Sequence, residues 1–208
     1  MELSPEMATY QSANSKMPLR PAVFLDRDGT LIEHVHYLAD AALVRILPGV
    51  PEALRLFREH GFACIVTTNQ SVIEKGLLDQ AGLELIHSQM AAQLSRDNAF
   101  LDAMYVCPRS SISNDLITID FLDRKPGPGM LLRAAAELGI DLARSWMIGD
   151  SISDVLAGHH AGCRGAIWLI DPPPPDPPRA LSNVRWHAEA NLLAAAREII
   201  LRQTNTSR

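Results

Sequence analysis

The segment Val23–Leu31, with the sequence VFLDRDGTL, places two carboxylates directly after a run of β-forming apolar residues. Strands of parallel sheets are buried on both faces and read as continuous apolar runs, and ligands bind just beyond their carboxyl ends. Asp26 and Asp28 lie at that position. Two carboxylates so close together repel each other, and a divalent cation with oxygen ligands is the simplest compensation. The alternative is a surface turn, where Asp and Gly are common.

Strand-like and helix-like segments alternate along the rest of the chain. After residues 23–25, apolar runs typical of strands occupy residues 62–66, 103–107, 145–148 and 166–170. Helical periodicity and turn residues predict helices over about 48–61, 79–96, 128–138, 151–162 and from 191 onwards. The alternation predicts an α/β fold, a three-layer Rossmann-like sandwich with a central parallel sheet. Residues 32–47 are expected to form a small flap beside the site, and the proline-rich residues 171–178 a stiff loop.

Length and composition limit the possible function classes. A chain of 208 residues suits one domain, and we expect residues 21–208 to form it, with residues 1–20 as a flexible tail. Hydrophobic residues make up 47% and charged residues 21%, which is typical of a soluble globular protein. The net charge of −5 gives no basic surface for nucleic acid, and no run approaches the length of a membrane span.

The cysteines and the first residues bear on the compartment. Cys64, Cys107 and Cys163 are far apart and odd in number, which argues against a disulfide framework and fits a reducing compartment. The first residues lack a basic stretch followed by an apolar one, so no signal peptide is expected. We therefore expect a cytoplasmic protein, a monomer or weak homo-oligomer, with no nucleic-acid or membrane partner.

Other polar side chains follow predicted strands or begin predicted helices, as Asp26 and Asp28 do. Lys125 precedes a proline at a helix start, where an ammonium and the positive end of the helix dipole both suit a phosphate. Each signal has a plain alternative, such as a strand-ending turn or a surface lysine. The shared position at element ends favours one common site. In chain order the residues are Asp26 and Asp28, Thr67, Thr68 and Asn69, Lys125, Asp150 and Asp154.

These segments resemble, in order, the four motifs of the haloacid dehalogenase (HAD) superfamily, most of whose members are magnesium-dependent phosphatases. DxDGT after an apolar strand resembles the first motif, and GDxxxD from Gly149 resembles the fourth. The resemblance implies that Asp26 attacks phosphorus and forms an aspartyl-phosphate. It implies that Asp28 acts as general acid toward the leaving group and then as general base toward water.

The resemblance also implies the rest of the site. Thr68, with Asn69 beside it, and Lys125 are the implied phosphate contacts. Mg²⁺ is the implied cofactor, with ligands drawn from Asp26, Asp28, Asp150 and Asp154. Asp154 would ligate the ion directly or through water, or would orient Lys125.

Over about residues 22–200, the chain is similar to one branch of the superfamily, the histidinol-phosphatases and D,D-heptose 1,7-bisphosphate phosphatases. The short spacing from Asp28 to Lys125 leaves no room for a large cap domain. The resemblance implies a small phosphorylated metabolite as substrate: a sugar, with heptose bisphosphate as the candidate, or histidinol phosphate as the alternative. Arg124 and Lys75 would grip a second phosphate or sugar hydroxyls, unless both face solvent.

The chain departs from that branch at two places. The heptose enzymes typically carry a zinc loop of the form CxH followed by CxC just before RKP, and here Cys107 alone survives. A lone thiolate cannot form a closed tetrahedral site, so we expect no zinc and a long loop over residues 108–123. Val72 stands where the branch usually has Gly, next to the expected pocket.

Two function classes other than a phosphohydrolase remain open. One is a non-catalytic phosphate-binding protein with a relict site, and the other is a carbon–halogen hydrolase. A relict has no need to retain all six catalytic-type residues found here. Halogen hydrolases do not normally keep an Asp two residues after the nucleophile. The sequence therefore favours a phosphohydrolase.

Overall fold

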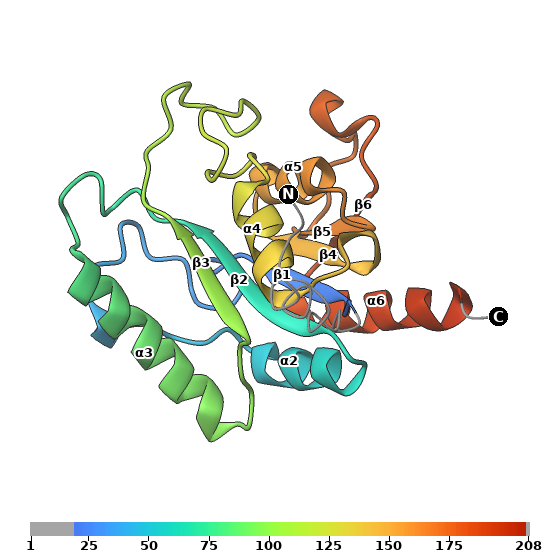
Figure 1. The fold of residues 1–208 in the computed structure, drawn as a ribbon, viewed down its shortest axis with the longest axis horizontal. Coiled ribbons are helices and arrows are strands. Elements are labelled where there is room, and N and C mark those ends of the chain that lie inside the picture. The colour runs from blue at the N-terminus through green and yellow to red at the C-terminus, as the bar shows by residue number, and fades with distance from the viewer. Residues whose placement is uncertain (1–18, 207–208) are drawn as a thin grey trace, which may run out of the picture.

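The structure, a computed structural model, describes residues 19–206, and the side chains of residues 19–203. Six parallel strands form one sheet in the order β3-β2-β1-β4-β5-β6 (Figure 1). The strands are β1 (Ala22–Leu25), β2 (Ala63–Asn69), β3 (Ala103–Cys107), β4 (Trp146–Gly149), β5 (Gly165–Leu169) and β6 (Trp186–Glu189). The helices are α2 (Val50–Glu59), α3 (Gln80–Arg96), α4 (Gly129–Leu138), α5 (Ile152–Ala161) and α6 (Leu192–Thr206). Three short 3-10 turns cover Ala41–Leu43, Leu142–Arg144 and Arg179–Leu181.

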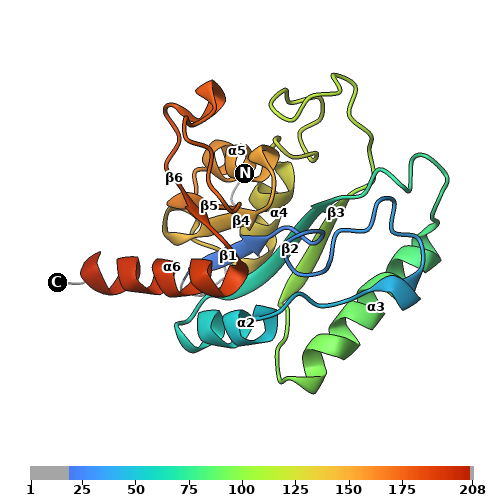
Figure 2. The ribbon, with the colours of Figure 1, turned by 180° about the vertical axis from the view of Figure 1, so that it is seen from behind.

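The central strands β1, β2 and β4 are buried on both faces, as their continuous apolar runs predict. Val23 and Leu25 point into one core with α2, α3 and α6, whereas Ala22 and Phe24 point into a second core with α4 and α5. Both views show α2, α3 and α6 on one side of the sheet and α4 and α5 on the other (Figures 1 and 2). This arrangement confirms the predicted three-layer sandwich, which carries its site at the strand ends.

The structure departs from the predicted elements at two strands. β2 continues three residues beyond the expected end, and Thr67, Thr68 and Asn69 pair in register with β3. Threonine is a good β-former, so these polar residues extend the strand rather than end it. The strand β6 was not predicted at all. It is a short edge strand whose residues are all half-buried, so its sequence has no continuous apolar run.

The first described residues already belong to the fold. Residues 1–18 of the expected tail lie outside the described part of the chain. Arg20, which was expected to be in the tail, donates its backbone N–H to Gly139 O at 3.1 Å and forms an ion pair with Asp102. Within residues 19–206, no helix combines the length and the apolarity needed to cross a bilayer.

Candidate active site

A cavity of about 260 Å³ opens beyond the carboxyl ends of β1, β2 and β4. The strand order reverses at β1, and ligands of open α/β sheets bind at such a switch point. All the predicted site residues except Lys75 line this cavity: Asp26, Asp28, Thr68, Asn69, Arg124, Lys125, Asp150 and Asp154. Segments more than 100 residues apart in sequence therefore meet at one edge of the sheet, as predicted.

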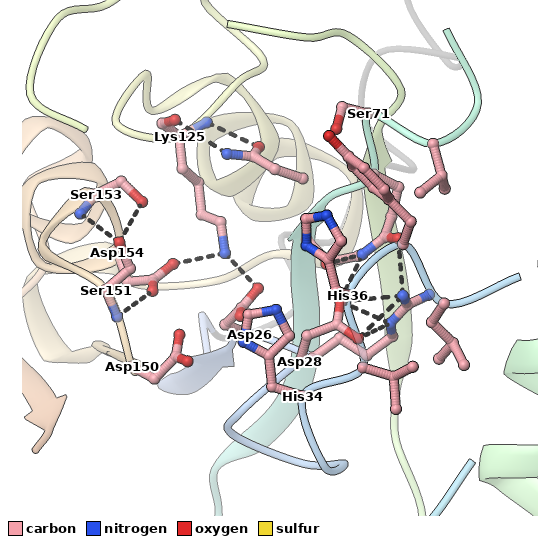
Figure 3. A pocket seen from close by; sticks show the side chains of 18 of the residues that line it. Asp26, Asp28, His34, His36, Ser71, Lys125, Asp150, Ser151, Ser153 and Asp154 are labelled. Carbon is pink, nitrogen blue, oxygen red and sulfur yellow. Dashed lines mark hydrogen bonds and ion pairs between the residues drawn. The ribbon is translucent and has the colours of Figure 1, made fainter. Parts of the chain in front are cut away.

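Three carboxylates gather at the centre of the cavity (Figure 3). Asp26, Asp150 and Asp154 each offer an oxygen within 4.8 Å of the others. Burial, together with repulsion from Asp26, raises the pKa of Asp150 to about 6. Burial also raises the pKa of Asp154 to about 7, although Lys125 opposes the rise. A divalent cation with oxygen ligands would relieve this repulsion, so the donor set fits Mg²⁺.

Two glycines leave the space that these carboxylates occupy. Gly29 has a φ of +75°, and a Cβ there would lie 2.1 Å from Asp150 Oδ2. A Cβ on Gly149 would lie 2.3 Å from Asp154 Cγ. The glycines of the DxDGT and GD segments are therefore required by close packing of the acidic side chains.

Lys125 is the buried cation of the site. Its Nζ lies 2.6 Å from Asp26 Oδ1 and 2.5 Å from Asp154 Oδ1, and it donates to Thr67 O at 2.7 Å. Figure 3 shows its side chain reaching between the two carboxylates. Burial alone would lower the pKa of Lys125, but attraction to Asp154 and Asp26 outweighs it, so the pKa lies above its ordinary value. The lysine is therefore charged and directed at the cavity.

Asn69 fixes the backbone of Lys125. Its side-chain Nδ2 donates to Lys125 O at 3.0 Å, and its Oδ1 accepts from Lys125 N at 3.1 Å. The prediction was that Asn69 binds phosphate. In the structure its amide is occupied by this two-point contact, which ties the start of α4 to the end of β2.

Asp154 has both carboxylate oxygens engaged. One forms the ion pair with Lys125, and the other accepts from the backbone N of Ser151 at 3.0 Å, completing the capping box of α5. Of the roles left open by the sequence, this geometry favours orienting Lys125.

The Asp28 carboxylate lies outside the three-carboxylate group. It accepts from Arg27 Nη2 at 3.0 Å and from Gln70 Nε2 at 2.7 Å. The expectation that Asp28 is a metal ligand is therefore not matched by its carboxylate, which the two neighbouring donors hold. Sequence reasoning passed over Arg27 and Gln70. A charged residue between two aspartates, directly after a buried strand, was the available signal.

Thr68 is fully buried and lines the cavity at the end of β2. Its Oγ1 accepts from Gln70 Nε2 at 2.8 Å. Because the oxygen is already an acceptor, the hydroxyl hydrogen remains free to be donated. This is the arrangement that a phosphate contact requires.

The predicted flap lies beside the cavity and lines it with His34, His36 and Tyr37. The two histidines are exposed. Lys75 does not line the cavity; its ammonium contacts the Tyr37 hydroxyl and lies 4.3 Å from the centre of that ring. Lys75 thus lies behind Tyr37, which lines the cavity.

The loop over residues 108–123 is held by side chains of its own. Asp120 accepts from Ser111 Oγ and from Ile112 N, each at 2.7 Å. The Arg109 guanidinium lies 4.6 Å from the centre of the Phe121 ring, and Arg109 O accepts from Arg124 Nη1 at 2.6 Å. Within residues 19–206, Cys107 belongs to no cluster of three His, Cys, Asp or Glu ligand atoms. The residues around this thiol therefore do not fit a tetrahedral zinc ion.

Comparison with known proteins agrees with the geometry. A family model described as HAD-hydrolase-like matches residues 122–169. The D-glycero-β-D-manno-heptose-1,7-bisphosphate 7-phosphatase of Rhodopseudomonas palustris is 36% identical over 149 residues, which cover 71% of this chain and 83% of the relative. The enzyme of that name from Escherichia coli K12 is 36% identical over 169 residues, or 80% of this chain and 87% of the relative.

A solved structure extends the likeness to the fold. The D,D-heptose 1,7-bisphosphate phosphatase of B. bronchiseptica, complexed with magnesium and phosphate, aligns with a TM-score of 0.70 at 25% identity. The alignment covers 89% of this chain and 99% of the other. The chain therefore belongs to the HAD-like hydrolase family and is one of its phosphatases.

Proposed function

We propose that the protein is a magnesium-dependent phosphomonoesterase that acts through an aspartyl-phosphate on a small phosphorylated sugar. D-glycero-D-manno-heptose 1,7-bisphosphate is the candidate substrate, since relatives at 36% identity carry that name. The observation that carries the proposal is the position of Lys125 between the buried carboxylates of Asp26 and Asp154, which form a group of three with the half-buried Asp150. A nucleophilic carboxylate, a cation for the phosphoryl group and a cation site are the parts that this chemistry needs.

Asp26 and Asp150 are the residues that would hold the magnesium ion. The oxygens of Asp154 are engaged by Lys125 and by the backbone of Ser151, so its role is to orient the lysine. A bound Mg²⁺ supplies positive charge that lets an anionic carboxylate approach an anionic phosphate.

The residues of the chain divide the reaction between them. An Asp26 oxygen attacks phosphorus while the bond to the leaving oxygen breaks, and Asp28 gives that oxygen its proton. Asp28 then takes a proton from a water molecule, and the water oxygen attacks the phosphorus. The bond between phosphorus and the Asp26 oxygen breaks, which releases inorganic phosphate and restores Asp26. Lys125 and the Thr68 hydroxyl hold phosphoryl oxygens in both steps.

The cavity wall supports a small polar substrate. Arg124 lines it on the side of the 108–123 loop, and Tyr37 and the flap close the other side. Val72 and Leu116 give the wall an apolar portion. A cavity of about 260 Å³ beside an arginine suits a phosphorylated sugar, whose second phosphate or hydroxyls accept from a guanidinium.

The test is a substrate panel with purified protein and Mg²⁺: heptose 1,7-bisphosphate, histidinol phosphate and p-nitrophenyl phosphate. We expect the highest kcat/KM for the heptose bisphosphate, with one phosphate released per molecule. A higher kcat/KM for histidinol phosphate would overturn the substrate and leave the chemistry standing. Failure to release phosphate from any monoester would overturn the proposed function.

A further inference from the structure

Arg27 is the largest of the fully buried side chains in the described part of the chain, only 1% exposed. It stands between the nucleophile Asp26 and Asp28 in sequence. Burying a guanidinium away from water is costly unless its charge is paired and its N–H groups are hydrogen-bonded. Its partners therefore indicate what the burial accomplishes.

Arg27, Gln70 and the Asp28 carboxylate form a closed ring of hydrogen bonds. Nε and Nη2 of Arg27 lie 3.0 to 3.3 Å from the two Asp28 oxygens, a bidentate contact. Nη2 also donates to Gln70 Oε1 at 2.7 Å. Gln70 Nε2 closes the ring by donating to Asp28 Oδ2, again at 2.7 Å. Bidentate pairing of this kind fixes the plane of a carboxylate as well as its position.

His87 of α3 contacts Arg27 through the guanidinium nitrogen that Asp28 and Gln70 do not use. Its Nε2 lies 3.4 Å from Arg27 Nη1. A guanidinium can only donate, so Nε2 is the acceptor and the ring proton is on Nδ1. Burial and the neighbouring Arg27 lower the pKa of His87 to about 4, which keeps the imidazole neutral at physiological pH. Through Arg27, α3 is therefore connected to a residue at the end of β1.

We infer that Arg27 and Gln70 are positioning residues for Asp28: they hold its carboxylate at the cavity and out of the Asp26–Asp150–Asp154 group. The inference rests on the proposed function, in which Asp28 exchanges the proton. The Asp28 side chain is 21% exposed and lines the cavity, so part of its carboxylate remains accessible to a substrate. A carboxylate without this support is free to turn toward a bound cation, where it cannot reach the leaving oxygen.

The test compares leaving groups. An alkyl phosphate needs a proton donor for its leaving oxygen, whereas p-nitrophenol leaves readily without one. For Arg27→Met we expect kcat/KM for an alkyl phosphate to fall by about 100-fold, the lower range of general acid catalysis, and kcat/KM for p-nitrophenyl phosphate to fall much less. Arg27→Lys keeps the charge but not the bidentate contact, and is expected to recover only part of the loss. Arg58→Met, which removes an arginine paired with Asp102 away from the cavity, is the matched control.

A double-mutant cycle separates positioning from general damage. If Arg27 acts through Asp28, then Arg27→Met has little further effect in the Asp28→Asn background. Additive losses in the cycle, or equal losses for both leaving groups, would overturn the inference. Gln70→Met leaves the Arg27–Asp28 pair in place and carries the same leaving-group test if Arg27→Met does not fold. If the wild-type protein hydrolyses no monoester, the proposed function itself is refuted. If the wild type is active but both variants keep its dependence on the leaving group, only the positioning role of Arg27 and Gln70 is refuted.

Discussion

Lys125 Nζ lies 2.6 Å from Asp26 Oδ1, although the two residues are 99 positions apart in the chain. Asp26 directly follows β1, whereas Lys125 precedes α4, so the contact links the central strand to the helix on one face of the sheet. The lysine also contacts Asp154, and it therefore has a second counterion if Asp26 loses its charge. Because Lys125 pairs with both aspartates, the charge of Asp26 can be removed to test its role as nucleophile while Lys125 stays paired with Asp154.

Asp26→Asn tests that separation. The neutral amide is a poor nucleophile, so we expect kcat to fall by at least about 10⁴-fold. The fold should survive, because Asp154 still pairs with Lys125. Turnover and thermal unfolding of the variant check both statements, with the exposed Asp123→Asn as a control. Turnover near the wild-type rate would refute the assignment of Asp26 as nucleophile.

The pH dependence of magnesium binding follows from the two raised pKa values. Asp150 titrates at about 6 and Asp154 at about 7, above the ordinary value of 3.8. Stability contributed by such groups is present below pH 4 and is lost as the pH rises through their folded-state values, roughly between pH 4 and 7. A metal ion held by Asp26 and Asp150 needs the deprotonated form of Asp150, so its stabilising effect grows as the pH rises through the pKa of Asp150, about 6.

We therefore expect Mg²⁺ to raise the Tm more at about pH 8 than at about pH 5. Asp150→Asn should flatten the pH dependence of the metal-free Tm and abolish most of the Mg²⁺ effect. Asp176→Asn, at an exposed position of the proline-rich loop, is the control and should change neither. A Mg²⁺ effect of the same size at both pH values would contradict the assignment of Asp150.

Much of this arrangement could be predicted because it lies in strand ends and helix starts. Asp26 and Asp150 each directly follow an apolar strand, and Lys125 lies shortly before α4, so the parallel topology brings all three to one edge of the sheet. The positions that could not be predicted depend on contacts across the sheet. The contact of Asn69 with the backbone of Lys125 can be predicted only if the two segments are known to lie side by side. The hydrogen bonds of Arg27 and Gln70 can be predicted only if the charged Arg27 side chain is known to be buried.

The edge strand β6 is an element of the fold that the sequence did not predict. It was missed because a strand with one neighbour is only half-buried and has no continuous apolar run. The position of Lys75 depends likewise on a tertiary contact, with Tyr37 of the flap. Spacing along the chain places Lys75 near the site without specifying the residue between it and the cavity.

Arg124 and Lys75 are predicted to differ in their effect on substrate recognition. Arg124 lines the cavity, so Arg124→Ala should raise KM for a sugar bisphosphate about tenfold or more, consistent with loss of a charge-assisted hydrogen bond. KM for p-nitrophenyl phosphate should change little, because that substrate offers only the reacting phosphate. Lys75→Ala acts through Tyr37 and should give a smaller change in the same direction.

Steady-state kinetics on both substrates checks this. Tyr37→Phe removes the hydroxyl that Lys75 contacts and keeps the ring, so it should reproduce the Lys75→Ala effect. Arg133→Ala, at a largely exposed arginine outside the cavity, is the control. Equal effects of Arg124→Ala on the two substrates would show that Arg124 does not contact the sugar or its second phosphate.

The 108–123 loop is predicted to keep its structure without zinc. Asp120 joins residues at the two ends of the loop, and hydrogen bonds from Ser111 and its neighbours lower the pKa of Asp120, so it is ionised at neutral pH. We expect substoichiometric zinc in protein purified without added metal, and no effect of a zinc chelator on amide exchange in the loop. About one zinc ion per chain would contradict this expectation.

Asp120→Ala should accelerate amide exchange over the loop, because the N–H groups of Ile112 and Ser113 lose their acceptor. Asp115→Ala is the matched control: its carboxylate accepts only within the adjacent turn, from Ile117 and Thr118, and its loss should affect that turn alone. Because the loop also carries Leu116 to the cavity wall, Asp120→Ala should raise KM for the sugar substrate more than for p-nitrophenyl phosphate. Unchanged exchange in the Asp120 variant would mean that the loop is held by other contacts, foremost the stacking of Arg109 on Phe121.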